Sequence, residues 1–158
     1  MFNFRPGSRM GVEIGLVKKY MSMFQIYDQY TTPYFGGWVT NIGWRNNYYL
    51  KLELSSDFPF RKPSLFVVVP QTLWMIGGIE TVNSRGVSHS FHTLTNGPNG
   101  CVQICHVRDW DASMTCQKVL LMGVLWCGAY EEYFRTGRDI KDILSDYLYR
   151  KGVCYVHH

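Results

Sequence analysis

The chain of 158 residues is long enough to bury one hydrophobic core and too short for two domains of ordinary size. Charged residues make up 18% and aromatic residues 16% of it, a balance that excludes an intrinsically disordered chain. The formal net charge of +4 is spread over short basic pairs such as Arg61 and Lys62, so we expect no nucleic-acid partner.

The five cysteines follow no regular spacing, and no secretion signal is recognisable at the N-terminus. This pattern predicts a reduced, cytoplasmic protein. No apolar run approaches the ~20 residues that cross a bilayer, so we expect no membrane partner.

A first helix is expected over residues 8–27, where Ser8 can cap the N-terminus. Its apolar stripe consists of Val12, Leu16, Met23 and Ile26. Thr-Thr-Pro and Gly-Gly then end the helical pattern before residue 38.

Three strands are expected next, over residues 38–42, 48–54 and 65–69. The second alternates strictly, which predicts an antiparallel sheet with one face covered by helices; its inward positions are Tyr48, Leu50, Leu52 and Leu54. The third is continuously apolar, which favours a central position. Two prolines in the segment SSDFPFRKP predict an ordered turn between the second and third strands, and residues 71–90 contain turns and at most a short hairpin.

Two helices are expected at the C-terminal end, making the fold α+β with helices on one face of an antiparallel meander. Ser113 or Thr115 caps the first, which runs to about residue 134 and ends at Gly137. Its expected core positions are Val119, Leu120, Gly123, Val124, Trp126, Cys127 and Tyr130. The second covers residues 138–150, with an apolar stripe made of Ile140, Ile143, Leu144, Tyr147 and Leu148.

The candidate chemistry lies where a Gly-Pro-Asn-Gly run leads into Cys101. This run predicts an exposed, rigid loop with a thiol at its edge, suited to carrying an acyl group as a thioester. Asn96 and Asn99 are candidate donors to the carbonyl oxygen, and His92 could activate the thiol. Core packing for the cysteine and loop hydrogen bonding for the histidine are the alternative interpretations.

A zinc site is the less favoured alternative for this region. It would draw its ligands from His89, His92, Cys101, Cys105 and His106. The two cysteines form a single CxxxC pair, whereas zinc sites of four ligands usually contain a CxxC-type pair as well. The sequence therefore predicts no metal and no cofactor, and a zinc-binding or thiol-dependent hydrolase has the least support.

Taken together, these motifs resemble the ubiquitin-conjugating enzyme family. DFPFRKP matches the family's [YF]PFxxP turn before a strand, His92 lies nine residues before Cys101, and WDASMT matches the W-S-P-x-[LMI]-T sequence that opens the next helix. The resemblance covers residues 38–126 and implies a UBC-like fold.

The resemblance implies a role for each matching residue. Cys101 would accept the C-terminus of a ubiquitin-like modifier from an activating enzyme and pass it to an amine on a target, and Asp111 could help to deprotonate that amine. Phe60 and the loop of Asp111, Ala112 and Ser113 match the two ligase-docking loops. Lys18 and Lys19 on the first helix match the surface that meets the activating enzyme.

The departures from the family pattern leave alternatives open. The family's His-Pro-Asn reads His92-Thr93-Leu94 here, so Asn96 or Asn99 would have to replace the missing asparagine. Such divergence resembles bacterial or viral relatives, which implies bacterial antiviral defence. Cys105 copies the family's Ile-Cys dipeptide but lies thirteen residues after His92, so Cys101 is favoured. An inactive UBC-like module that binds a ubiquitin-like protein or a ligase is the second hypothesis.

Overall fold

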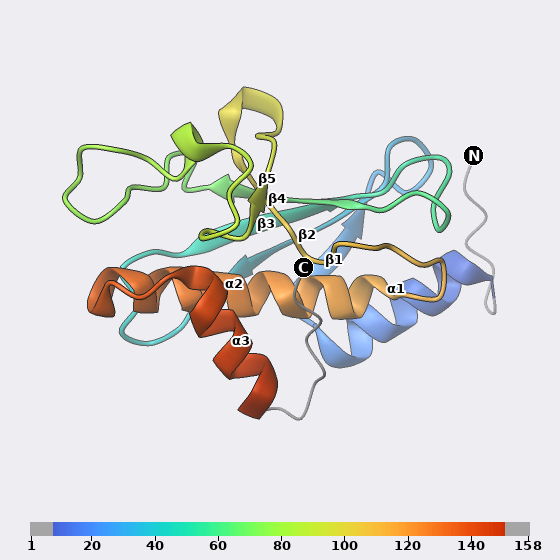
Figure 1. Ribbon diagram of the computed structural model, residues 1–158. Helices are drawn as coiled ribbons and strands as arrows, with labels where there is room; N and C mark the ends of the chain where they lie inside the picture. Colours follow the sequence, from blue (N-terminus) through green and yellow to red (C-terminus); the bar gives the residue numbers. More distant parts are fainter. Residues whose placement is uncertain (1–7, 151–158) are drawn as a thin grey trace.

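An antiparallel sheet carries the helices on one of its faces in the computed structural model, which describes residues 8–150 (Figure 1). The helices are α1 (Arg9–Tyr20), α2 (Cys116–Thr136) and α3 (Ile140–Arg150). The strands are β1 (Phe24–Tyr27), β2 (Tyr34–Val39), β3 (Tyr48–Glu53), β4 (Ser64–Val69), β5 (Thr93–Leu94) and β6 (Val102–Ile104). The expected α+β fold, with one N-terminal and two C-terminal helices, is confirmed.

The strand order is β1-β2-β3-β4-β6-β5, and every neighbouring pair is antiparallel. The first four strands form a meander, and β6 returns to pair with β4 after a long excursion of the chain. Because β4 lies between β3 and β6, its expected interior position is confirmed.

The predicted first helix is correct at its start and wrong at its end. The Ser8 hydroxyl caps α1 by accepting a hydrogen bond from the Gly11 amide at 3.0 Å. The helix stops at Tyr20, and residues 24–27 form β1 instead, because pairing with β2 overrides a weak helical pattern. The buried face of α1 is also not the predicted one: Met10, Glu13 and Val17 point inward, and Val12 is 47% exposed.

The strand expected over residues 38–42 is β2, which begins earlier, at Tyr34, because its two glycines belong to the strand. Both lie inside the strand, where a side chain would not fit. A Cβ on Gly36 would clash with the Tyr49 ring, and one on Gly37 would clash with the Met23 carbonyl. The short strands β5 and β6 were not predicted at all.

The predicted strand over residues 48–54 and its buried face are confirmed, with Leu50 and Leu52 fully buried. α2 begins after Thr115, whose hydroxyl accepts from the Lys118 amide, and ends at Gly137 with φ +78°. Gly123 lets the helix approach the sheet, since a Cβ there would lie 2.8 Å from Leu50. Its predicted core positions are buried except Val124, which is only half-buried. The helices therefore cover one face of the sheet and leave the other open.

Candidate thiol site and docking surface

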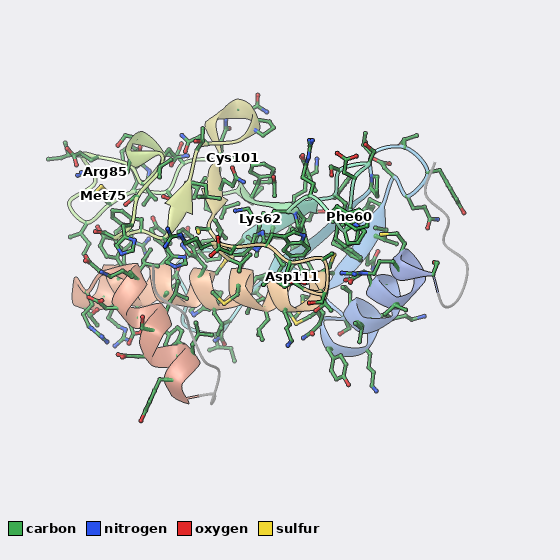
Figure 2. All side chains as sticks on the ribbon, turned by 45° about the vertical axis from the view of Figure 1, so that its right-hand side comes forward. Phe60, Lys62, Met75, Arg85, Cys101 and Asp111 are labelled. Carbon is green, nitrogen blue, oxygen red and sulfur yellow. The ribbon has the colours of Figure 1, made fainter. Side chains whose placement is uncertain are left out.

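Cys101 lies on the face of the sheet that the helices leave open (Figure 2). It follows a short 3-10 turn (Pro98–Gly100) and directly precedes β6. Its neighbours are side chains of β3 and β4 that alternate with the buried ones, among them Lys51, Glu53 and Phe66. Together they line a cavity of about 210 Å³ with the cysteine in its wall.

The loop before Cys101 is held by backbone geometry and by one asparagine. Asn99 and Gly100 have φ of +59° and +75°, a left-handed conformation that these two residue types adopt most readily. The Asn83 amide group donates to the carbonyls of Gln71 and Gly100, both at 2.8 Å. Asn83 therefore fixes the loop, and no pattern in the sequence identified it.

The Cys101 thiol is buried, which corrects the expected exposed position. Only 5% of the residue is accessible to solvent. Burial raises the pKa of the thiol, and backbone hydrogen bonds at Gly97 and Cys101 offset part of this rise; the charges of Glu53 and Lys51 have smaller effects in opposite directions. Cys101 is therefore protonated at neutral pH and is not a spontaneously activated nucleophile.

The predicted oxyanion donors occupy different positions. Asn99 lines the same cavity as Cys101. The Asn96 amide instead donates to the Asn83 carbonyl at 2.8 Å and serves to hold the loop. Gln71, two residues after the end of β4, also lines the cavity and donates to the Asn99 carbonyl at 2.7 Å. Its position after a predicted strand was a usable signal that sequence reasoning missed.

His92 lies against the other candidate cysteine. Its Nδ1 is 2.7 Å from the Cys105 carbonyl oxygen, and its own carbonyl accepts from the Cys105 amide at 3.0 Å. The Cys105 thiol is half-buried, and burial raises its pKa, with a partial offset from the positive charge of Lys62. The structure thus brings together His92 and Cys105, and separately Asn99 and Cys101.

We expect the two thiols to react slowly with iodoacetamide at pH 7, Cys105 faster than Cys101 because it is more exposed. Between pH 7 and pH 8 each rate should rise about tenfold, as expected for thiols whose pKa values lie above that range. Mass spectrometry of tryptic peptides measures both rates. Cys116 and Cys127 are buried, with pKa values raised well above normal by burial, and provide unreactive internal references. A Cys101 rate equal to that of a free cysteine would contradict the burial. Cys154 lies outside the described residues.

The two motifs that carried the family resemblance bind each other. The Trp110 indole donates to the Pro59 carbonyl at 2.6 Å, and the His106 imidazole Nε2 contacts the Pro63 carbonyl at 2.7 Å. Phe60 is left 83% exposed at the tip of the turn. The segments around residues 58–63 and 106–113 therefore form one continuous surface, which we call the docking end.

Arg9 attaches α1 to the docking end. Its guanidinium donates to the carbonyls of Ala112 and Met114 and lies over the Phe58 ring. The exposed Asp111 carboxylate accepts hydrogen bonds from the amide and hydroxyl of Ser113, which lower its pKa. The structure therefore gives Asp111 a local turn partner, and its role as a base stays a prediction.

Lys18 and Lys19 are exposed near the C-terminal end of α1. Arg9 and the docking end lie at the beginning of the same helix.

Within residues 8–150, no three His, Cys, Asp or Glu side chains are grouped so that they could hold a metal ion. No helix of that described part has the length and apolar character needed to cross a membrane.

Comparison with known proteins gives no match: no protein family model, no curated protein and no solved structure is similar to the chain.

Proposed function

We propose that the protein is a conjugating enzyme that carries a ubiquitin-like modifier as a thioester on Cys101 and transfers it to an amine. The observation that carries this proposal is the position of the thiol in the wall of a narrow cavity beside hydrogen-bond donors. Asn99, Gln71 and Lys51 line that cavity. At about 210 Å³ it is smaller than pockets for drug-sized ligands, and so it suits the narrow end of a chain.

The chemistry needs positioning more than acid-base groups. The Cys101 thiol gives its proton to water, and the sulfur attacks the thioester carbonyl of the loaded activating enzyme. A C–S bond to Cys101 forms as the C–S bond to the activating enzyme breaks, and the released thiolate of that enzyme takes up a proton from water. A target amine later attacks the same carbonyl, so that an amide bond forms as the C–S bond to Cys101 breaks, and the proton lost by the amine passes to the released Cys101 thiolate. Donors at the cavity would stabilise the oxyanion in both steps.

The raised pKa of Cys101 is compatible with carrying the modifier as a thioester. A thiol of high pKa is a poor leaving group, so its thioester resists attack by water until an amine is positioned. A hydrolytic enzyme would need the opposite, an activated thiolate beside a base. The His92 Nδ1 lies beside the Cys105 carbonyl, and the ionisable side chains that line the cavity of Cys101 are Lys51 and Glu53.

The docking end supports a UBC-like arrangement of partners. We assign ligase docking to Phe60, Ala112 and Ser113, and contact with the activating enzyme to the exposed Lys18 and Lys19. Positive charge on the helix suits an acidic partner surface. The setting implied by the resemblance is the cytoplasm of a bacterium, in defence against viruses.

A thioester assay tests the proposal. The protein is incubated with ATP, an activating enzyme and the ubiquitin-like modifier of that enzyme, then run on a non-reducing gel. We expect an adduct that reducing agent removes and that persists in Cys105→Ser. Cys101→Ser should abolish this adduct or leave only an oxyester that reducing agent does not cleave. Loss of the adduct in Cys105→Ser alone would assign the reaction to the Cys105 sulfur.

The burial of Cys101 favours a second candidate function, an inactive module that binds the modifier or a ligase. Its thiol is only 5% exposed, and the Asn96 amide is committed to Asn83. In that case no cysteine forms an adduct, and calorimetry detects binding of the modifier that Cys101→Ser leaves unchanged.

A further inference from the structure

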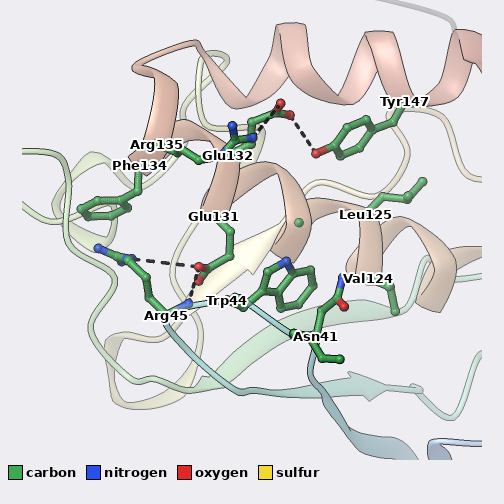
Figure 3. Close-up of a pocket in the computed structure, with 13 residues that line it drawn as sticks. Asn41, Trp44, Arg45, Val124, Leu125, Glu131, Glu132, Phe134, Arg135 and Tyr147 are labelled. Carbon is green, nitrogen blue, oxygen red and sulfur yellow. Dashed lines mark hydrogen bonds and ion pairs between the residues drawn. The ribbon is translucent and has the colours of Figure 1, made fainter.

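A second pocket lies on the helical side of the molecule, between the β2–β3 loop, α2 and α3 (Figure 3). Its volume of about 760 Å³ falls in the range of pockets that hold small organic ligands. Cys101 lies on the opposite face of the sheet, so this pocket is separate from the thiol site.

The floor of this pocket is apolar, and a glycine keeps it open. Trp44, Leu125 and Tyr147 line it around Gly128, which belongs to α2. Glycine in the interior of a helix is unfavourable relative to alanine. A Cβ on Gly128 would lie 3.4 Å from the Trp44 ring and 3.8 Å from the Tyr147 ring, which are ordinary contacts. Packing therefore does not require this glycine, and its effect is to leave space between two aromatic rings.

The two carboxylates at the pocket are already engaged. Glu131 accepts hydrogen bonds from the Arg45 amide at 2.7 Å and from the Tyr48 hydroxyl, and its side chain is 8% exposed. Glu132 accepts from the Tyr147 hydroxyl at 2.8 Å, and its side chain is 24% exposed. A cationic ligand would therefore meet acceptors that other donors occupy.

Two guanidinium groups are exposed at the same pocket. Arg45 stacks on Phe134, 3.5 Å from the ring centroid, its Nε lies 4.0 Å from the Glu131 carboxylate, and its side chain is 49% exposed. Arg135 bonds Glu132 at 3.3 Å and is 72% exposed. Each guanidinium has five N–H donors, which is more than these contacts use. The pocket thus combines an aromatic floor with cationic donors at its rim.

We propose that this pocket binds an amphiphilic organic anion: an apolar group that inserts between Trp44 and Tyr147 over Gly128, with a carboxylate or sulfonate bound by Arg45 and Arg135. The volume of the pocket suits a free small molecule, and this is the ligand that we propose. A protein segment with an aromatic residue beside an acidic one presents the same chemistry, and its binding in place of the small molecule is the alternative outcome of the competition experiment.

Binding of 1-anilinonaphthalene-8-sulfonate to the folded full-length chain tests the proposal, because this fluorescent probe combines an aromatic body with a sulfonate. We expect one site, weakened about tenfold or more in Gly128→Leu, which fills the floor. Gly128→Ala should weaken the probe less and raise the melting temperature, because it improves the helix. If Gly128 had only a structural role, probe binding and melting temperature would not change in opposite directions in Gly128→Ala.

Matched controls come from the same chain. Gly15→Leu places the same side chain on α1, where nothing lies within 4 Å of its Cβ, and should leave binding unchanged. Arg45→Gln combined with Arg135→Gln should weaken the probe several-fold and reduce its salt dependence. Arg61→Gln removes a guanidinium of similar exposure elsewhere and should have no effect.

Competition identifies the source of the ligand. Displacement of the probe by decanoate indicates a free amphiphile, and displacement by the peptide acetyl-Asp-Trp-Asp-amide indicates a protein segment. Displacement by decylamine as effective as that by decanoate would overturn the preference for anions. Three results would overturn the site. They are unchanged probe binding in Gly128→Leu, loss of probe binding in Trp38→Ala instead, and failure of both anionic competitors to displace the probe.

Discussion

Glu13→Ala is expected to lower the free energy of unfolding by roughly 3–5 kcal/mol, because two hydrogen bonds to a buried carboxylate are lost and the buried Cys116 amide is left without its acceptor. The Glu13 side chain is fully buried and accepts from Arg9 at 2.9 Å and from the Cys116 amide at 2.6 Å. These bonds join the start of α1 to the start of α2. Urea unfolding measures the loss as a midpoint lower by about 2 M, for a slope of about 2 kcal/mol/M.

Two further variants serve as controls for the Glu13→Ala experiment. Glu13→Gln keeps an acceptor for the Cys116 amide and should cost less than Glu13→Ala. Glu53→Gln breaks a partly exposed pair with Lys51 and should cost about 1 kcal/mol or less. A loss in Glu13→Ala no larger than the loss in Glu53→Gln would show that the buried pair does not form.

His106 should make stability fall by about 3 kcal/mol as the pH drops from 6.5 to 4. Burial lowers the pKa of His106 to about 4, and the nearby Lys62 acts in the same direction, against a hydrogen bond to Pro63. The ring is 6% exposed, and its Nδ1 has no hydrogen-bond partner among the described residues. Above pH 6.5 the ring is neutral in both states. Below it the unfolded chain binds the proton first, so stability is lost until the folded pKa is reached.

Unfolding measured at several pH values, with the wild type compared with His106→Gln, isolates this contribution. The variant keeps a donor for the Pro63 carbonyl and has no group that titrates, so its stability should fall less over the same interval. Carboxylates titrate in both proteins and cancel in the difference. Identical pH profiles would mean that His106 is hydrated in the folded state.

The elements predicted well were those whose patterns depend on a single buried face. The alternation in β3 and the amphipathic spacing in α3 needed no tertiary information, and Thr115 and Gly137 are local signals. The predictions were wrong where contacts between residues far apart in the sequence determine the local structure. β1 and the glycines of β2 depend on strand pairing, and a buried glutamate such as Glu13 violates the apolar pattern of a helix.

The candidate site was predictable only in its residue spacing. The spacing of nine residues from His92 favours Cys101, and the structure gives it a cavity with Asn99. Spacing could not reveal that the thiol is buried, or that His92 contacts Cys105. Those facts depend on how the chain returns to the sheet, which the distant hydrogen bonds of Asn83, Asn96 and Gln71 fix.

The return of the chain to the sheet at β6 has a consequence for the order in which the strands fold. β6 pairs with β4 only after residues 70–101 have closed on themselves, whereas β1 to β4 are joined by short turns. Closing a long loop costs entropy before any contact repays it, so we expect β6 to join the sheet late in folding. Val102 and Ile104 of β6 are core residues, and Cys101 directly precedes them. We therefore expect the thiol to become buried only in the last stage of folding, when β6 takes its place between β4 and β5.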